Sequence, residues 1–223
     1  MPTPPPTLSS IQVGTVRILG RDEAPEPFDK AWTTGIFKTT VEGPVHVITV
    51  GIDGDAQADL TVHGGPDKAL CAYSASHYPA WRAELALPGF VHGAFGENLT
   101  IGGLAEGDIC IGDTWLAGDV VLQVTQPRQP CWKLSQKWRV RTLTAQVLES
   151  GRTGWYFRVL RVGDLAAGMP LTLDARPHAE WTITAANAVM HHRKDDVVAA
   201  KALAALPELS QSWRATLTRR IAG

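Results

Sequence analysis

The chain has few cysteines, and their small number and spacing narrow the class of protein. Only three occur in 223 residues, namely Cys71, Cys110 and Cys131, and no two of them form a CxxC pair. Such a set argues against a disulfide framework and against a structural zinc site. Free thiols are typical of a reducing compartment, so we expect a cytoplasmic protein.

Net charge and long apolar runs are also nearly absent. The formal net charge is −1, which argues against the broad basic surface that stable nucleic-acid binding needs. No apolar run approaches the roughly 20 residues of a membrane-spanning helix, so we expect no membrane insertion. The opening MPTPPPTLSS has neither a basic start nor an apolar stretch, so we do not expect it to be a secretory signal. We expect residues 1–10 to form a flexible leader.

Short β-branched or alternating runs, broken by glycine, proline and aspartate, dominate residues 11–175. We predict strands at residues 11–19, 45–50, 60–64, 99–103, 108–112 and 120–126. Helical patterns are fewer and cover residues 74–86, a segment beginning at Trp132, and residues 144–151. The sequence therefore predicts a mainly β protein with helices (α+β), built as a closed or nearly closed β-barrel.

Residues 176–223 differ in composition, because they are alanine-rich and helical in pattern. Three helices are expected, over residues 181–192, 195–206 and 207–221, with Pro207 at the start of the last. Within it, Leu209, Trp213, Leu217 and Ile221 recur every four residues and would form one apolar stripe. We expect a small three-helix appendage that packs on the barrel or on a second subunit, which makes a homodimer a further expectation.

The segment TQPRQPCWKL surrounds Cys131 with rigid residues. Pro130 fixes its own backbone angle, and residues that precede a proline are held extended. Cys131 then stands between a strand and a helix start, with Arg128 nearby, and this position favours the thiolate form. A thiolate attacks electrophiles or binds soft metals. The neighbourhood lacks the glycine-rich loop of tyrosine phosphatases and the surroundings of a papain-type cysteine, and a buried inert thiol remains an alternative.

The segment HGGPDKA offers groups that bind anions. His63 precedes Gly64 and Gly65, which let the backbone approach a ligand closely, and Lys68 follows. Backbone N–H groups beside a lysine suit a phosphate. The alternative is a tight turn with a solvated lysine. GxxxxGK[ST] is absent, so this is not a P-loop.

Other polar residues are weaker signals when each is taken alone. Lys38 lies in a polar stretch between apolar ones, and Asn98 follows a glycine in FGENLTI, where it can donate and accept hydrogen bonds. The aspartates of DGDAQADLTVHGG do not fit a calcium loop, because the template positions for glycine and the last acid hold Ala58 and Gly64. Cys71 and Cys110 lie in strand-like runs and are expected to fill the core.

Five segments taken together resemble one family. In order they are TTGIFKTTVEGPV, GDAQADLTVHGGPDKALCAY, FGENLTI, TQPRQPCWKL and SGRTGWYFRVL. They resemble the MOSC family, which is related to the C-terminal domain of molybdenum-cofactor sulfurase, and most closely its YiiM-type subgroup. The resemblance implies a MOSC β-barrel over residues 11–175 and a small three-helix domain over residues 176–223.

The resemblance also implies a cofactor and a reaction. Family members bind molybdopterin, and the cysteine that matches Cys131 supplies a thiolate to molybdenum. We expect Lys38, His63, Gly64, Gly65, Lys68, Asn98 and Arg128 to hold the cofactor and its phosphate. The implied reaction is reduction of N-hydroxylated compounds, such as hydroxylamino-purines, to amines, with His63 as proton donor or, alternatively, in a structural hydrogen bond. No nicotinamide or flavin fingerprint occurs, so electrons would come from an external NAD(P)H-dependent flavoprotein.

A second implied role is that of a carrier for molybdenum cofactor or for persulfide sulfur on Cys131, without redox turnover. The family is also associated with pyridoxal phosphate. In the sulfurase relatives, however, a large separate pyridoxal-phosphate domain supplies the sulfur, and 223 residues leave no room for one.

Overall fold

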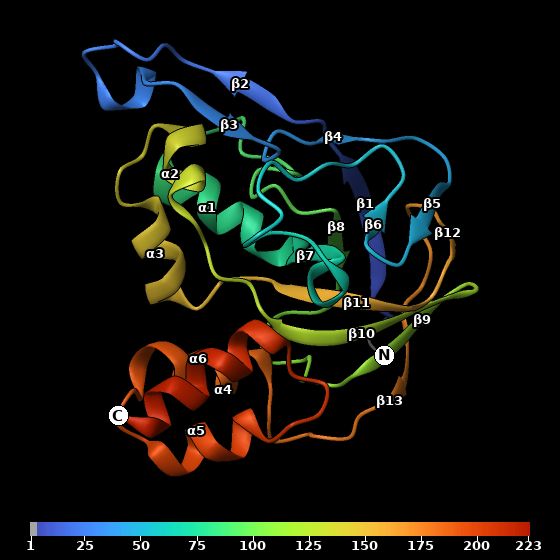
Figure 1. The fold of residues 1–223 in the computed structure, drawn as a ribbon. Helices are drawn as coiled ribbons and strands as arrows, with labels where there is room; N and C mark the ends of the chain where they lie inside the picture. Colours follow the sequence, from blue (N-terminus) through green and yellow to red (C-terminus); the bar gives the residue numbers. More distant parts are fainter. Residues whose placement is uncertain (1–3) are drawn as a thin grey trace.

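A curled sheet of eight strands forms the centre of the fold (Figure 1). The structure, a computed structural model, describes residues 4–223. The strands in their order across the sheet are β13 (Thr172–Ala175), β9 (Thr114–Ala117), β10 (Val120–Pro127), β11 (Trp155–Arg161), β7 (Leu70–Ser74), β8 (Leu99–Gly102), β1 (Thr7–Val13) and β4 (Thr39–Thr40). Strands β7 and β8 pair parallel and the other neighbours pair antiparallel. The sheet curls into a half-barrel, which confirms the mainly β architecture with helices.

Alternation along the strands decides which side chains form the barrel core. In β11, Trp155, Phe157 and Val159 are buried in the main apolar cluster, whereas Tyr156 and Arg158 point to the other face. This second face of β11, with the neighbouring strand β7, becomes the floor of the candidate site described below.

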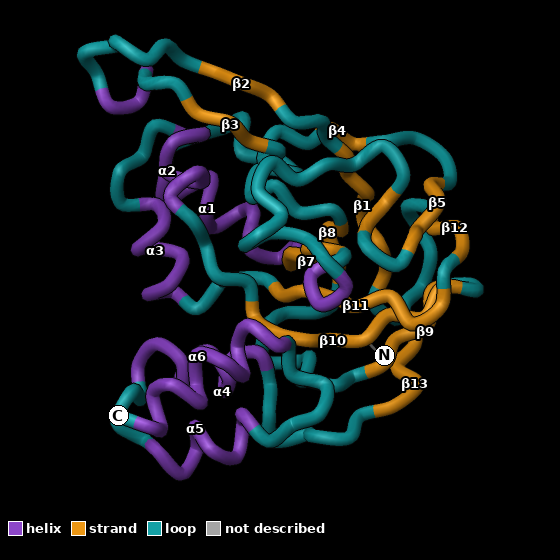
Figure 2. The backbone as a smooth tube through the Cα atoms, viewed as in Figure 1, coloured by secondary structure: helices purple, strands orange, loops and turns teal. Residues whose placement is uncertain are grey.

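Smaller elements frame the half-barrel (Figure 2). One three-stranded sheet is formed by β12 (Gly163–Leu165), β5 (Val45–Ile48) and β6 (Gly51–Ile52), and a hairpin by β2 (Arg17–Leu19) and β3 (Trp32–Thr34). Single 3-10 turns occur at η1 (Pro27–Asp29), η2 (Pro66–Lys68) and η3 (Ala75–His77). The turn η2 carries part of the HGGPDKA segment.

Three helices cover one end of the half-barrel. They are α1 (Tyr78–Leu85), α2 (Trp132–Trp138) and α3 (Leu143–Ser150). Their buried residues, among them Trp81, Leu134 and Val147, join Tyr73 and Phe95 in a second apolar cluster. Helix α3 ends at Gly151, which adopts a left-handed φ of 70°, as the sequence predicts for a glycine stop.

The C-terminal helices pack directly on the sheet below β10 (Figure 1). They are α4 (Ile183–Asn187), continued by the π-helical turn η4 (Ala188–His192), then α5 (Val197–Ala204) and α6 (Gln211–Ala222). Trp213 and Leu217 are buried in the same cluster as the barrel residues, with Ile221 packed against it. The three-helix appendage and its apolar stripe are thus confirmed.

Some expected boundaries were wrong. Residues 60–64 form turns rather than a strand, and residues 108–112 contribute only an isolated bridge at Cys110. Residues 11–19 break into β1 and β2 around Gly14, where a side chain would collide with the Phe37 carbonyl. Residues 1–3 of the expected leader lie outside the described residues, whereas residues 7–10 belong to β1.

Helix α6 also begins later than expected. Ser210, not Pro207, caps it, because the Ser210 side chain accepts a hydrogen bond from the backbone N–H of Trp213 at 3.3 Å. The Ser210 hydroxyl thus pairs a backbone N–H group of the first helical turn that has no partner within the helix. A proline has no side-chain oxygen that could accept from such a group.

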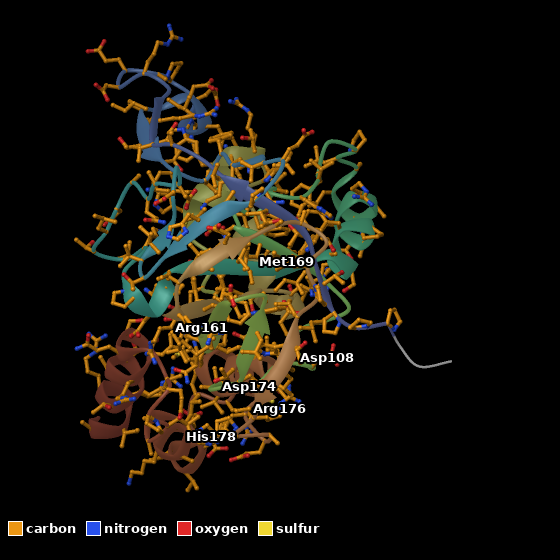
Figure 3. All side chains as sticks on the ribbon, turned by 90° about the vertical axis from the view of Figure 1, so that its right-hand side faces the viewer. Asp108, Arg161, Met169, Asp174, Arg176 and His178 are labelled. Carbon is orange, nitrogen blue, oxygen red and sulfur yellow. The ribbon has the colours of Figure 1, made fainter. Side chains whose placement is uncertain are left out.

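The segment between β13 and α4 is anchored rather than free. Arg176 donates to the buried carboxylate of Asp113 at 2.6 Å and to the carbonyl of Asp108 at 2.8 Å. Figure 3 shows Asp108, Arg176 and His178 close to the junction of sheet and C-terminal helices. Within residues 4–223, no helix has both the length and the apolar character needed to cross a membrane.

Candidate functional site

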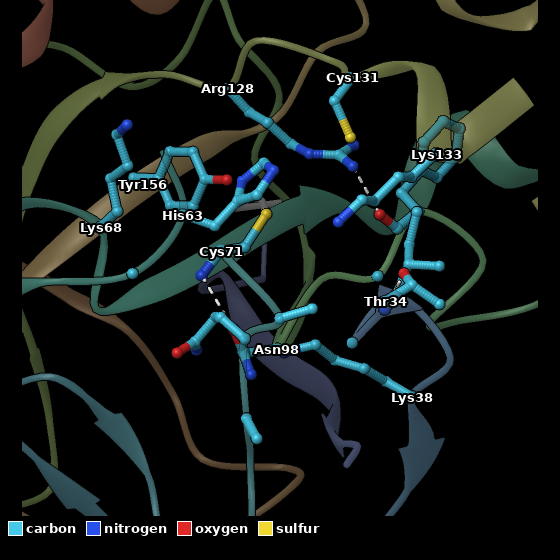
Figure 4. A pocket seen from close by; sticks show the side chains of 18 of the residues that line it. Thr34, Lys38, His63, Lys68, Cys71, Asn98, Arg128, Cys131, Lys133 and Tyr156 are labelled. Carbon is cyan, nitrogen blue, oxygen red and sulfur yellow. Dashed lines mark hydrogen bonds between the residues drawn. The ribbon is translucent and has the colours of Figure 1, made fainter. Parts of the chain in front are cut away.

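A pocket lies over β7 and β11, where the segments after β3, β6 and β10 meet (Figure 4). Its volume is about 80 Å³. The predicted site residues that line it are Lys38, His63, Gly64, Lys68, Asn98, Arg128 and Cys131. Gly65 does not line it but precedes η2 with a left-handed φ of 79°, which a glycine adopts without strain. Residues from four separate sequence motifs therefore converge on one hollow.

Cys131 occupies the position immediately before helix α2. Its backbone is extended, its side chain makes no capping hydrogen bond, and the residue is half-buried. Its carbonyl accepts hydrogen bonds from the backbone N–H of Leu134 at 3.1 Å and from Thr144 Oγ1 at 3.2 Å. The backbone is thus held from both helices while the thiol points into the pocket (Figure 4).

Arg128 supplies a buried positive charge beside Cys131. Its Nη2 donates to the carbonyl oxygen of Phe95 at 2.6 Å, and its backbone N–H donates to Gly154 at 2.9 Å. The other terminal nitrogen, Nη1, is buried and has no hydrogen-bond partner among the described residues. An unpaired buried guanidinium nitrogen is costly, and an anion in the pocket would satisfy it.

His63 is held in its neutral form near pH 7. Burial, followed by the positive charges of Arg128, Lys133 and Lys68, lowers its pKa to about 4. Asp59 opposes this shift only weakly. These three positive charges add to the effect of burial, and the positive potential that they create favours binding of an anionic ligand.

Lys38 is committed to a buried ion pair. Its Nζ lies 2.6 Å from Asp55 Oδ2, with the two side chains 6% and 0% exposed. Asp55 also accepts from the backbone N–H of Gly14 and from Asn98 Nδ2, each at 2.9 Å. The Asn98 Oδ1 atom in turn accepts from the backbone N–H of Cys71 at 3.2 Å. Lys38 and Asn98 therefore line the pocket, but their polar groups mainly hold its wall together.

The remaining cations are more available to a ligand. Lys68 Nζ donates to the carbonyl of Val62 at 2.8 Å, which uses one of its three N–H groups. Lys133 lines the pocket from helix α2, with its Nζ 6.0 Å from the centre of the Trp132 ring. No carboxylate occurs among the described lining residues, so the lining is positive.

Sequence reasoning missed several residues of the pocket. Cys71, expected to fill the core, is buried but lines the hollow beside Tyr156, its partner across β7 and β11. Alternation along SGRTGWYFRVL places Tyr156 opposite the buried Trp155 and Phe157, and this signal could have identified it. Asp55 carried no such signal, because its role depends on Lys38 and Gly14 being brought to it by the fold.

The donor set fits a soft metal attached to an anionic organic group. The Cys131 thiol is the soft ligand, and the unpaired Nη1 of Arg128 with Lys68 and Lys133 matches a phosphate. Within the described residues there is no group of three or more histidines, cysteines or carboxylates that could hold a metal alone. A metal here would need further ligands from the group that carries it.

Comparison with known proteins identifies the family. Residues 59–172 match the MOSC domain, and residues 181–223 match the YiiM-like, 3-alpha helix domain. The uncharacterized protein YflK of Bacillus subtilis (strain 168) is 41% identical over 202 residues, which cover 91% of each chain. Protein YiiM of Escherichia coli (strain K12) is 36% identical over 84% of each chain. A protein of Gibberella moniliformis named "Reductase" is 35% identical over 72% of this chain, which corresponds to 29% of the fungal protein.

Solved structures agree with these matches. The crystal structure of YiiM from Geobacillus stearothermophilus superposes with a TM-score of 0.81 at 38% identity, covering 97% of this chain and 100% of that one. YiiM from Escherichia coli gives a TM-score of 0.75 at 29% identity, over 95% of this chain and 93% of the other. The chain therefore belongs to the MOSC family, among the members that carry the YiiM-like three-helix domain.

Proposed function

We propose that the chain is a molybdopterin-dependent reductase that converts N-hydroxylated compounds, such as hydroxylamino-purines, to amines. The observation that supports this best is the pairing of a pocket-facing thiol, Cys131, with the unpaired buried Nη1 of Arg128. Membership of the MOSC family and the similarity to a fungal protein named "Reductase" support it independently.

In this proposal the chain's own residues hold the cofactor at both ends. Cys131 is the protein ligand of the metal, and its backbone is fixed by Leu134 and Thr144. Arg128, Lys68 and Lys133 receive the phosphate. When bound, the molybdenum cofactor supplies two-electron redox chemistry that amino-acid side chains cannot perform.

The reaction requires two electrons and two protons for each substrate. The N–O bond of R–NH–OH breaks, and the products are the amine R–NH₂ and one molecule of water. An external NAD(P)H-dependent flavoprotein supplies the electrons. His63 is the group that moves a proton. Burial is the largest cause of its pKa of about 4, and a bound phosphate would offset the further lowering by the neighbouring cations. The pKa would then rise, and the imidazole could accept a proton from solvent and pass it to the leaving oxygen.

The wider setting follows the same proposal. With three free cysteines, the enzyme works in the reducing cytoplasm, takes a small-molecule substrate and binds neither membrane nor nucleic acid stably. A homodimer is compatible with these roles and forms part of the proposal.

Turnover separates an enzyme from a carrier. Molybdenum-loaded protein is reduced with dithionite and mixed with 6-hydroxylaminopurine, and the adenine formed is measured by chromatography. The proposal expects adenine to form with wild type and to be lost in Cys131→Ala. If fully loaded and reduced wild type leaves the compound unchanged, the reductase assignment is wrong and a carrier role is favoured.

A further inference from the structure

A second hollow lies on the other side of the two segments that wall the first. Residues 34–38 and the start of helix α2 line the first pocket, whereas Trp32, Phe37, Gln136 and Lys137 line the second. The second hollow has a volume of about 320 Å³, is open to solvent, and is lined in part by the loop that follows β2. The two hollows therefore share both of their walls.

The sizes of the two hollows indicate that a ligand extends beyond the first. Sites for small organic ligands generally measure about 300–1,000 Å³. The first pocket, at about 80 Å³, is below that range, while the second, at about 320 Å³, falls within it. Part of any larger molecule at Cys131 must lie outside the first pocket.

Aromatic side chains line the second hollow, and the cluster extends to Trp132. The rings of Trp32 and Phe37 have centroids 6.0 Å apart, and those of Trp32 and Trp132 lie 5.8 Å apart. Trp132 directly follows Cys131 in the chain and is 55% exposed, although a large apolar surface of this kind is usually covered. Phe28 adds a third ring to the lining of the second hollow. Such surfaces bind flat aromatic groups by stacking.

The charges of the second hollow favour an anion. Arg21, Lys137 and Arg139 contribute three positive charges and Asp29 one negative charge, so the lining carries a net charge of +2. Asp29 Oδ1 accepts a hydrogen bond of 2.6 Å from Arg139 Nη1. The other N–H groups of the Arg139 guanidinium remain available to a ligand. The positive charge of Arg21 also acts on Asp29 and helps to lower the pKa of its carboxyl group, after the larger effect of Arg139.

Lys137 forms the inner end of this charged lining. Its Nζ donates to the carbonyls of Ile36 at 3.2 Å and Gly93 at 2.9 Å, so one of its three N–H groups is left. The ammonium also lies 5.3 Å from the centre of the Phe37 ring. A cation is thus placed beside an aromatic wall.

We propose that the second hollow binds a planar aromatic anion, represented by a nucleoside 5′-monophosphate. The ring lies against Trp32 and Phe37, and the phosphate meets Arg21 and Arg139. The binding claim stands on the hollow alone.

Calorimetric titration with AMP, adenosine and inorganic phosphate tests the binding claim. AMP should bind at least about tenfold more tightly than either fragment, because ring and phosphate are recognised together. Arg21→Gln should weaken AMP binding about fivefold and leave adenosine binding unchanged, since it removes one exposed charge contact. The matched control is Arg219→Gln on the exposed face of α6, which should bind AMP as wild type does.

The outcomes separate this inference from the proposed function. The inference is overturned if AMP gives no saturable binding, binds no better than its fragments, or loses the same affinity in Arg21→Gln and Arg219→Gln. If AMP binds as expected but loaded and reduced protein leaves 6-hydroxylaminopurine unchanged, the site stands and the reductase proposal fails. If the free base is reduced and AMP does not bind, the reductase proposal stands and the nucleotide site is wrong.

Discussion

Asp67, in the loop that lines the first pocket, accepts a hydrogen bond of 2.8 Å from the backbone N–H of Gln211, the first residue of helix α6. Its other carboxylate oxygen accepts from Arg158 Nε at 3.1 Å. Its carbonyl accepts from Thr125 Oγ1 at 2.6 Å. The C-terminal helices therefore hold the His63–Lys68 loop in place, and they are part of the support of the site.

Replacing Asp67 by alanine should loosen this support. We expect the free energy of unfolding to fall by about 1–3 kcal/mol, because charge-assisted hydrogen bonds are lost. The affinity for inorganic phosphate should fall as well, since Lys68 is the next residue. Chemical denaturation and calorimetry measure both. Asp174→Ala, at an exposed carboxylate of β13, is the control and should change neither.

The Asp67 contribution should depend on pH in a defined direction. Burial alone would raise the pKa of Asp67, but the hydrogen bond from Gln211 and the contact with Arg158 outweigh it and lower the pKa below its usual value. A lowered folded-state pKa stabilises the fold above the unfolded value of about 3.9, and this stabilisation is lost as pH falls through the folded value. The difference in melting temperature between wild type and Asp67→Asn should shrink only in acid. A difference that vanished near pH 7 would contradict this.

Lys38→Met should act on stability more than on ligand binding. The buried carboxylate of Asp55 would lose its ion-pair partner, which costs about 3–5 kcal/mol when one member of a buried pair is removed. Asp55 already neutralises Lys38, but the variant leaves Asp55 as an unpaired negative charge in the pocket wall. Phosphate affinity measured at a temperature where the variant is folded should therefore fall only modestly. An unchanged denaturation midpoint together with lost phosphate binding would show that Lys38 serves the ligand instead.

His63 should respond to an anion in the pocket. Its pKa of about 4 should rise when inorganic phosphate is added, because phosphate offsets the charges of Arg128, Lys133 and Lys68. Titration of the imidazole proton signals by NMR measures this. A pKa that phosphate leaves unchanged would place the anion elsewhere.

His63 should also make the stability of the fold sensitive to acid. Unfolded His63 titrates near 6.5 and folded His63 near 4, so the unfolded state binds more protons between these values. Stability should therefore fall as pH decreases from about 6.5 towards 4. His63→Gln, which cannot be protonated, should show a shallower decline over that range in thermal melts, and a slope equal to that of wild type would argue against the lowered pKa.

The barrel and the helical tail could be predicted from sequence because their signals are local. Alternating runs such as VVLQVTQ became β10, and the stripe of Trp213, Leu217 and Ile221 became the buried face of α6. The strand expected at residues 60–64 was wrong, because LTVHG has β-branched residues but no neighbouring strand to pair with. Strand pairing is a non-local property that a short run does not encode.

The site could be predicted only in part for the same reason. Cys131 and Arg128 stand in one stiff segment, and the sequence indicated both. Whether a lysine faces a ligand or a buried carboxylate depends on segments distant in the chain, and Lys38 meets Asp55 through such a contact. The roles of Cys71 and Tyr156 likewise required the pairing of β7 with β11.

The central claim is that Cys131 holds the molybdenum of a bound cofactor. The most direct test measures molybdenum by mass spectrometry in protein freshly purified from a host that makes the cofactor. Wild type should contain molybdenum in proportion to protein, and Cys131→Ala should lose it. Cys71→Ala, which removes the other thiol of the same pocket, should retain it. Molybdenum retained in Cys131→Ala, or lost only in Cys71→Ala, would contradict the account.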